Sequence, residues 1–389
     1  MNILTDCIRA DTEYGHLLHT IKTMRRDHPL PVVAAGLSEG AADALTVSLL
    51  EDLKSAGFGC ALIVCSEEKE CTRCLSVLGS AGIRAAFFPA RDLTLYNLTA
   101  SHEFEHERLK VLSGYLGGIY DVVLTTPDAA LSYTIPAGRL KAAEISVWAD
   151  ESLDVGQLTE LLVSAGYIRV DMVEAPGQFA LRGGIVDIYP PHAEYSYGDE
   201  TRYGSLPVRI ELFGDEIDRI GTFDPESQRF IEGIAGLKMT PARELLADDD
   251  STAAIKRAIA QQLKKAEGAG DDKAADELNG ELAALEADRG ASFLDKYMTL
   301  IYPERQCLLD YFPAGSPVFI RNTPAVSDRL KSSEWLMNQN ITELLEGGTL
   351  AGKYAEYSKP QAAFEHFCDT SLTLHLDSLS HGLSGRRLG

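Results

Sequence analysis

AGYIRVDMVEAPGQFALRGGIVDIYPPH, residues 165–192, is the stretch from which the fold is most readily inferred. Pro176 fixes its own φ, and Gly177 supplies the open dihedral angles of a tight turn. The sequence therefore predicts a hairpin in which two extended segments, carrying Arg169 and Arg182, lie side by side.

A second strand-rich stretch, PVRIELFGDEIDRIGTFDPESQRFIE, covers residues 207–232. Apolar and charged residues alternate on both sides of Gly214-Asp215, a pattern typical of a hairpin between half-buried strands. Asp224-Pro225 then ends the run in a turn. Together the two stretches predict a strand-rich domain in the middle of the chain.

Two phrases in these stretches match a known family at many polar positions: GQFALRGGIVDIYP, residues 177–190, and RIELFGDEIDRIGTFDPESQR, residues 209–229. They resemble the second domain of a module shared by the excision-repair helicase UvrB and the bacterial transcription-repair coupling factors. The resemblance implies that this domain docks onto UvrA, the ATPase that first senses DNA damage.

The first 130 residues alternate short apolar strands with helical stretches. The predicted strands are residues 31–35, 60–65, 85–88 and 122–125. Strands joined by crossover helices form a parallel sheet covered on both faces. With the resemblance, the predicted fold class is α/β: a degenerate RecA-like or helicase-like parallel-sheet domain with an inserted strand-rich α+β domain 2 and a helical return segment.

The resemblance divides the chain into four parts. Residues 1–130 are expected to form domain 1a, the α/β domain, and residues 131–238 to form domain 2. Residues 239–350 are expected to form domain 1b, which consists of a helical hairpin and a segment that returns to the α/β domain. Residues 351–389 are expected to be a tail or linker toward C-terminal domains beyond this sequence.

The segment after the first predicted strand has the length of a phosphate-binding loop without its chemistry. It reads Gly36-Leu37-Ser38-Glu39-Gly40-Ala41-Ala42-Asp43. A functional loop, G-x-x-x-x-G-K-[ST], uses lysine to reach the β- and γ-phosphates and a hydroxyl to hold magnesium. Ala42 and Asp43 stand at these two positions, so Gly36, Gly40, Ala41, Ala42 and Asp43 are interpreted as a vestigial nucleotide site. Asp43 is expected to serve as the N-cap of the following helix.

This departure distinguishes the two families, because UvrB keeps a working ATP site here and the corresponding module of the coupling factors (Mfd) is degenerate. The resemblance thus favours the coupling factors. It implies a UvrA-recruiting module that links stalled RNA polymerase to nucleotide excision repair, without catalysis or a cofactor of its own. ATP, magnesium, RNA polymerase and DNA are expected to engage only further domains, which make the full-length protein a DNA translocase. The alternative is a UvrB-like ATP-dependent repair helicase subunit.

Composition supports a protein partner over nucleic acid. The chain has 389 residues and a net charge of -22, from 58 acidic and 36 basic side chains, without a basic block that would hold a polyanion. The sequence has no apolar run of about 18 residues, which a membrane-spanning helix would need, and a cytoplasmic location is expected. The seven cysteines do not form a disulfide framework, and Cys71 and Cys74 make a CxxC without a second pair, so no metal site is predicted.

The predicted UvrA-binding residues lie in domain 2. Arg169 and Arg182 match arginines of the family motif, and arginine suits this task because its planar fork makes bidentate bonds with carboxylates. Gly183 and its neighbour Gly184 would allow a partner backbone to approach closely. Further candidates are Asp187, Tyr189, Glu211 and Phe213. The alternative for Arg182 is an internal pair with Asp187 or Glu211. In the full-length protein another domain is expected to mask this surface by an autoinhibitory contact.

Overall fold

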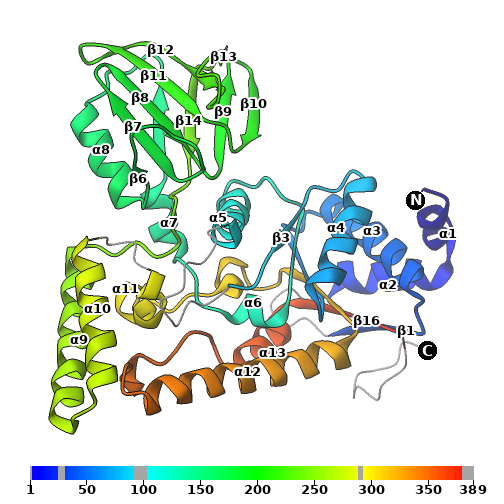
Figure 1. The fold of residues 1–389 in the computed structure, drawn as a ribbon. Helices are drawn as coiled ribbons and strands as arrows, with labels where there is room; N and C mark the ends of the chain where they lie inside the picture. The colour runs from blue at the N-terminus through cyan, green and yellow to red at the C-terminus, as the bar shows by residue number, and fades with distance from the viewer. Residues whose placement is uncertain (1, 25–30, 92–102, 288–291, 379–389) are drawn as a thin grey trace.

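The computed structural model describes residues 2–24, 31–91, 103–287 and 292–378. A strand-rich domain stands above a larger α/β body, and a pair of long helices flanks that body (Figure 1). The combination of a parallel sheet with antiparallel strand-rich sheets confirms the predicted fold class.

The α/β body is built on a six-stranded parallel sheet. Its strands, in spatial order, are β1 (Val32–Ala35), β16 (Leu372–Asp377), β15 (Pro317–Arg321), β2 (Ala61–Val64), β4 (Val122–Thr125) and β3 (Ala85–Phe88). Alternate residues of the central strands enter two separate cores, as in a sheet covered on both faces: Ala61 and Ile63 of β2 enter one core, and Leu62 and Val64 enter the other.

Helices cover both faces of this sheet. The helices before the strand-rich domain are α1 (Asn2–Ala10), α2 (Thr12–Thr23), α3 (Glu39–Ser55), α4 (Glu68–Ser80), α5 (Glu103–Leu116), α6 (Pro127–Leu131) and α7 (Ala137–Ala143). Those after it are α9 (Asp249–Ala269), α10 (Asp272–Ala287), α11 (Met298–Ile301), α12 (Thr323–Glu346) and α13 (Gln361–Thr370), with 3-10 turns η1 (Ser292–Tyr297), η2 (Leu308–Tyr311) and η3 (Gly352–Tyr354). The predicted helical hairpin is confirmed as α9 and α10, and its buried Leu278 and Leu285 belong to the core.

The predicted tail at 351–389 is wrong for much of its length, because β16 lies inside the sheet between β1 and β15. Its six residues are largely buried; residues 374–377 pair with β1 and residues 372–376 pair with β15, so this segment is part of the body and not a linker. Residues 379–389 lie outside the described part of the chain.

The strand-rich domain contains two sheets and one helix, α8 (Val155–Ser164). The four-stranded sheet has the order β10 (Glu200–Gly204), β9 (Ala193–Tyr197), β14 (Gly236–Met239) and β5 (Ile145–Trp148). The six-stranded sheet has the order β13 (Phe230–Gly233), β12 (Glu216–Phe223), β11 (Val208–Phe213), β8 (Ile185–Tyr189), β7 (Gln178–Arg182) and β6 (Ile168–Arg169). The first strand begins at Ile145, so the sheets start later than the predicted boundary at 131, and Tyr133 still pairs with Cys307 of the body.

One of the two predicted hairpins is confirmed. β11 and β12 pair antiparallel around Gly214, whose φ of 66° is in the region that glycine favours. The other prediction is wrong in direction, because β6 and β7 pair in parallel. The backbone N–H groups of Glu174 and Ala175 donate to Oε1 of Gln178, at 2.8 and 3.1 Å, so the intervening residues form a loop and not a two-residue turn.

A buried carboxylate joins the two domains where the chain leaves domain 2. Both oxygens of Glu244 accept from Arg108 of α5, at 2.9 and 3.0 Å, and Nη1 of Arg91 lies 3.1 Å from Oε2. Thr134, on the segment that leads into domain 2, also donates to this carboxylate. Nη2 of Arg91 continues to Asp295, at 2.6 Å. Segments before and after domain 2 are therefore fixed to the body at one point.

The charge of Glu244 is stabilised by these partners. Burial alone would raise its pKa, but the positive charges of Arg108 and Arg91 and the hydrogen bonds from Arg108 and Thr134 outweigh burial, and the pKa of Glu244 is lowered. An ionised Glu244 therefore stabilises the folded state.

Replacing Glu244 by glutamine should destabilise the protein by about 3 to 5 kcal/mol, because the buried Arg108 loses its counter-charge and the buried Arg91 keeps only Asp295 as an ion-pair partner among the described residues. Urea unfolding at pH 7 would measure this, with Glu304→Gln, which removes an exposed partner of Arg139, as the control expected to change stability by less than about 1 kcal/mol. Since the folded-state pKa of Glu244 is lowered, its contribution is present above the unfolded-state value of about 4.3 and is lost as pH falls through the folded-state value. The difference between wild type and variant should shrink on acidification; a constant difference would contradict the assignment.

Candidate functional site

The predicted UvrA-binding residues gather, with one exception, on one face of the six-stranded sheet. Val208, Ile210 and Leu212 of β11 pack into the core between the two sheets, so the residues between them face outward. The register aligns Arg209 with Asp187 and Glu211 with Ile185, while Ile185 also aligns with Arg182 of β7. We call this the outer face and define it by six residues: Arg182, Asp187, Tyr189, Arg209, Glu211 and Phe213.

Asp187 is the electrostatic centre of the outer face. Its side chain is 1% exposed, and its two oxygens accept from Nε and Nη2 of Arg209 at 2.7 and 2.9 Å. Nη2 of Arg182 donates to the same carboxylate and lies 3.3 Å from Oε1 of Gln228. The internal pair that was the alternative for Arg182 is thus present, with Asp187 as the partner.

This internal pair leaves Arg182 available to a partner. Its side chain is 43% exposed. A guanidinium carries five N–H donors, and Asp187 and Gln228 both bind the same nitrogen, Nη2. Arg209, by contrast, is 12% exposed and stacks over the ring of Phe223 at 4.3 Å. Asp187 therefore orients one arginine toward solvent and holds a second beneath it.

Arg169 does not join this group. It pairs with Phe179, whose side chain lies in the core between the sheets, whereas Arg182 stands three residues further along β7. Because side chains alternate along a strand, Arg169 and Arg182 belong to opposite faces and to opposite ends of β7. The prediction that Arg169 and Arg182 form a pair on one surface is therefore wrong, although each residue is exposed.

The other candidates have different environments. Phe213 is 84% exposed at the end of β11, where the chain turns into β12. Tyr189 is partly buried against a small cluster that includes Phe223. Gly183 has a φ of 61°, which the β7–β8 turn requires, and a Cβ on Gly184 would lie 2.8 Å from the carbonyl oxygen of Leu212 on β11, so each glycine has a structural role within the domain. Sequence reasoning missed Arg209, although its alternation with Ile210 and Glu211 could have placed it on the same face.

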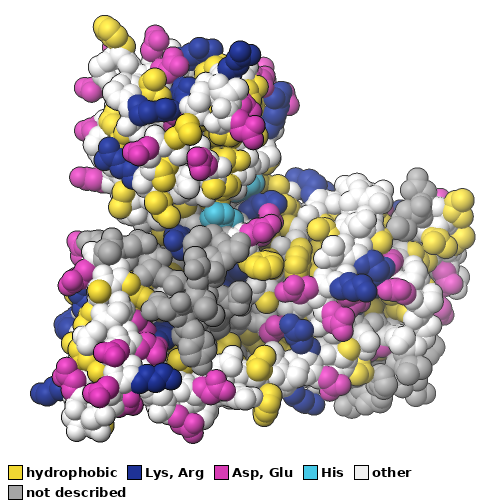
Figure 2. All heavy atoms as spheres, in the orientation of Figure 1, with side chains coloured by type: hydrophobic (Ala, Val, Ile, Leu, Met, Phe, Trp, Pro, Cys, Tyr) yellow, Lys and Arg dark blue, Asp and Glu magenta, His cyan; other side chains and the backbone are white. Residues whose placement is uncertain are grey.

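Charges on the strand-rich domain are mixed. Basic and acidic side chains are interspersed over its visible surface and do not form a single basic field (Figure 2). Such a pattern is suited to local pairing with a protein partner, since phosphate backbones are bound by concentrated positive charge.

The vestigial nucleotide segment has a geometry of its own at the carboxyl edge of the parallel sheet. Gly36, with φ 79°, leaves β1, and α3 begins at Glu39 with Ser38 as N-cap, whose side chain accepts from the backbone N–H of Ala41. Gly40, Ala41, Ala42 and Asp43 are consequently helical. The prediction that Asp43 is the N-cap is wrong, because Ser38 takes that place one turn earlier.

Asp43 instead holds two arginines from distant segments. Oδ2 lies 2.6 Å from Nη1 of Arg73 on α4, and Oδ1 lies 2.8 Å from Nη2 of Arg321 at the end of β15. The carboxylate is 9% exposed and Arg321 is 5% exposed. A buried ion-pair network therefore lies at the helical position where a phosphate-binding loop would carry its hydroxyl.

Replacing Asp43 by asparagine should destabilise the fold by about 2 to 3 kcal/mol, since Arg321 is buried and loses a charged partner while keeping Glu70. Glu39→Gln is the matched control, because Glu39 pairs with the same Arg73 but is 70% exposed, and it should cost less than about 1 kcal/mol. Thermal and urea unfolding would measure both. An equal loss of unfolding free energy in the two variants would show that burial does not determine how much the Asp43–Arg321 ion pair contributes to stability.

Comparison with known proteins agrees with this geometry. The family described as "UvrB interaction domain" matches residues 145–245, which begin with β5 and end after Glu244. The transcription-repair-coupling factor of Bacillus subtilis (strain 168) is 28% identical over 81% of this chain and 26% of that protein. That of Staphylococcus haemolyticus is 23% identical over 75% of this chain and 25% of that protein.

The chain spans about a quarter of the length of these curated relatives. Within its described residues, none of the helices combines the length and apolar character needed to cross a membrane. The resemblance inferred from the sequence is confirmed: the chain is similar to the N-terminal, UvrB-like module of transcription-repair-coupling factors, and residues 145–245 carry its UvrB interaction domain.

Proposed function

We propose that this chain recruits UvrA through the outer face of domain 2, as the UvrA-binding part of a transcription-repair coupling factor. The observation that carries the proposal is the exposed guanidinium of Arg182, held in place by the buried carboxylate of Asp187. A pre-oriented arginine loses little conformational freedom on binding and forms charge-assisted bonds to carboxylates.

Phe213 completes this surface as a large apolar side chain near the charged centre. An aromatic anchor surrounded by polar groups is typical of the residues that dominate protein interfaces. Glu211 and Arg219, which pair across β11 and β12, would form part of the polar rim. Arg169, on the opposite face, is assigned at most a peripheral role.

The proposed role does not include catalysis by this chain. Asp43 and its two arginines stand where nucleotide chemistry would require a lysine and a hydroxyl, which supports a binding module. In the longer proteins, RNA polymerase and DNA would engage other domains, and one of these would mask the outer face until transcription stalls. The alternative, a UvrB-like ATP-dependent subunit, requires that the chain bind Mg·ATP, and calorimetric titration with Mg·ATP should give no heat of binding.

Calorimetric titration of UvrA into this chain tests the proposal. Arg182→Glu should weaken binding by about 2 kcal/mol or more, roughly 30-fold in Kd, because the new carboxylate would face the acidic groups of the partner that bind the arginine. Arg202→Glu is a matched control, since Arg202 is 45% exposed and lies on β10 of the other sheet, and its Kd should stay within about threefold of wild type.

Circular dichroism and the urea midpoint would verify that both variants fold. Equal Kd values for wild type and Arg182→Glu would contradict the proposed surface. An equal loss in both variants would mean that net charge, and not the outer face, determines binding.

A further inference from the structure

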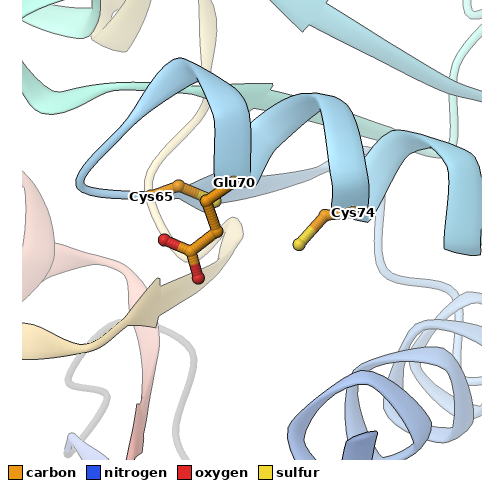
Figure 3. Close-up of side chains that lie close together, drawn as sticks. All are labelled: Cys65, Glu70 and Cys74. Carbon is orange, nitrogen blue, oxygen red and sulfur yellow. The ribbon is translucent and has the colours of Figure 1, made fainter. Parts of the chain in front are cut away.

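Three potential metal ligands converge between β2 and α4. Cys65 directly follows β2, while Glu70 and Cys74 are four residues apart on α4 and so share one face of that helix. The sulfur atoms of the two cysteines and a carboxylate oxygen of Glu70 all lie within 4.8 Å of one another. Figure 3 shows the three side chains on the same side of α4.

The neighbourhood adds a third thiol. Cys71 is fully buried on α4, directly after Glu70. The two sulfurs of Cys65 and Cys74 and one carboxylate oxygen of Glu70 are within reach of one point, and Cys71 lies beside this group without belonging to it. Tetrahedral zinc has Zn–S bonds of about 2.3 Å, which places ligand atoms about 3.8 Å apart, so a small contraction of the observed cluster suffices.

We propose that Cys65, Glu70 and Cys74 form a binding site for a soft divalent cation of the zinc class, with the fourth position left to water. Thiolate sulfur selects such cations over magnesium or calcium, which prefer oxygen. On binding, each coordinating thiol gives its proton to solvent, and the metal–sulfur bond replaces the S–H bond.

The charges around the cluster fit a bound thiolate set. Two thiolates and one carboxylate bring three negative charges against the two positive charges of the cation. Nε of Arg321 lies 3.1 Å from Oε1 of Glu70, and Nη2 of Arg73 lies 3.6 Å from the sulfur of Cys74. These guanidinium groups offset the excess negative charge and orient the ligands.

The site also has a route to solvent. The side chain of Glu70 is 24% exposed and that of Arg73 is 34% exposed, whereas Cys65 and Cys74 are buried. The cluster lies at the carboxyl ends of β2 and β15, the edge at which open α/β sheets bind their ligands. A second CxxC pair is absent from the sequence, and the missing sulfur comes instead from Cys65, at the end of the preceding strand β2.

The test is titration of the reduced, metal-free protein with Cd²⁺ and, separately, Zn²⁺, under a phosphine reductant that prevents disulfide formation. One equivalent of Cd²⁺ should produce an ultraviolet thiolate-to-metal charge-transfer band, and one equivalent of Zn²⁺ should raise the Tm. Cys65→Ser and Cys74→Ser should each weaken metal binding by more than about 100-fold, and Glu70→Gln by about 10- to 100-fold.

Cys7→Ser and Cys368→Ser are the controls, because these thiols lie elsewhere in the fold and should leave the band unchanged. Circular dichroism of each metal-free variant would show whether it folds, and Glu70→Gln, which keeps all three thiols, provides the measurement if a serine variant does not. No charge-transfer band in the wild type, or an equal band in the wild type, Cys65→Ser and Glu70→Gln, would overturn the proposal.

Discussion

The two domains are connected at Glu244, and most of the arrangement described above depends on that buried carboxylate. Its partners come from α5, from the segment after β3 and from the segment that leads into domain 2. Removing a carboxylate from water is costly unless positive charge and hydrogen bonds replace the solvent, and Arg108 and Arg91 supply both. The same geometry that satisfies Glu244 brings both connections to domain 2 against the body.

The same arrangement recurs at two other places. Asp43 holds Arg73 and Arg321 at the edge of the parallel sheet, and Asp187 holds Arg182 and Arg209 on the outer face. In each case one buried carboxylate holds two arginines that come from different helices, strands or loops. In a chain with net charge -22, such pairs bury part of the acidic excess while fixing tertiary contacts.

Local patterns predicted much of the fold. Alternation around Gly214 predicted β11 and β12, and helical spacing predicted α9 and α10, because these elements are set by contacts between neighbours in sequence. The errors concern long-range contacts. A short apolar stretch at 372–376 carries no information about where it pairs, and Asp43 is as suitable for an N-cap as for a buried ion pair until Arg321 is in place. The outer face was predicted in part. The alternation of apolar and charged residues identifies which residues share the face, whereas the pairing of Arg209 with Asp187 follows only from the strand register in the structure.

The position of β16 determines when the parallel sheet can be completed. Among the described strands, β1 reaches the sheet only through β16, and β15 and β16 separate it from β2. A ribosome adding about 5 to 20 residues per second must therefore synthesise almost the whole chain before β1 finds its partner. Residues 145–245 form a continuous unit with its own core, whose contacts are all available much earlier. The domain that carries the outer face can thus fold during translation, whereas the parallel sheet of the α/β body can be completed only after β16 has been synthesised.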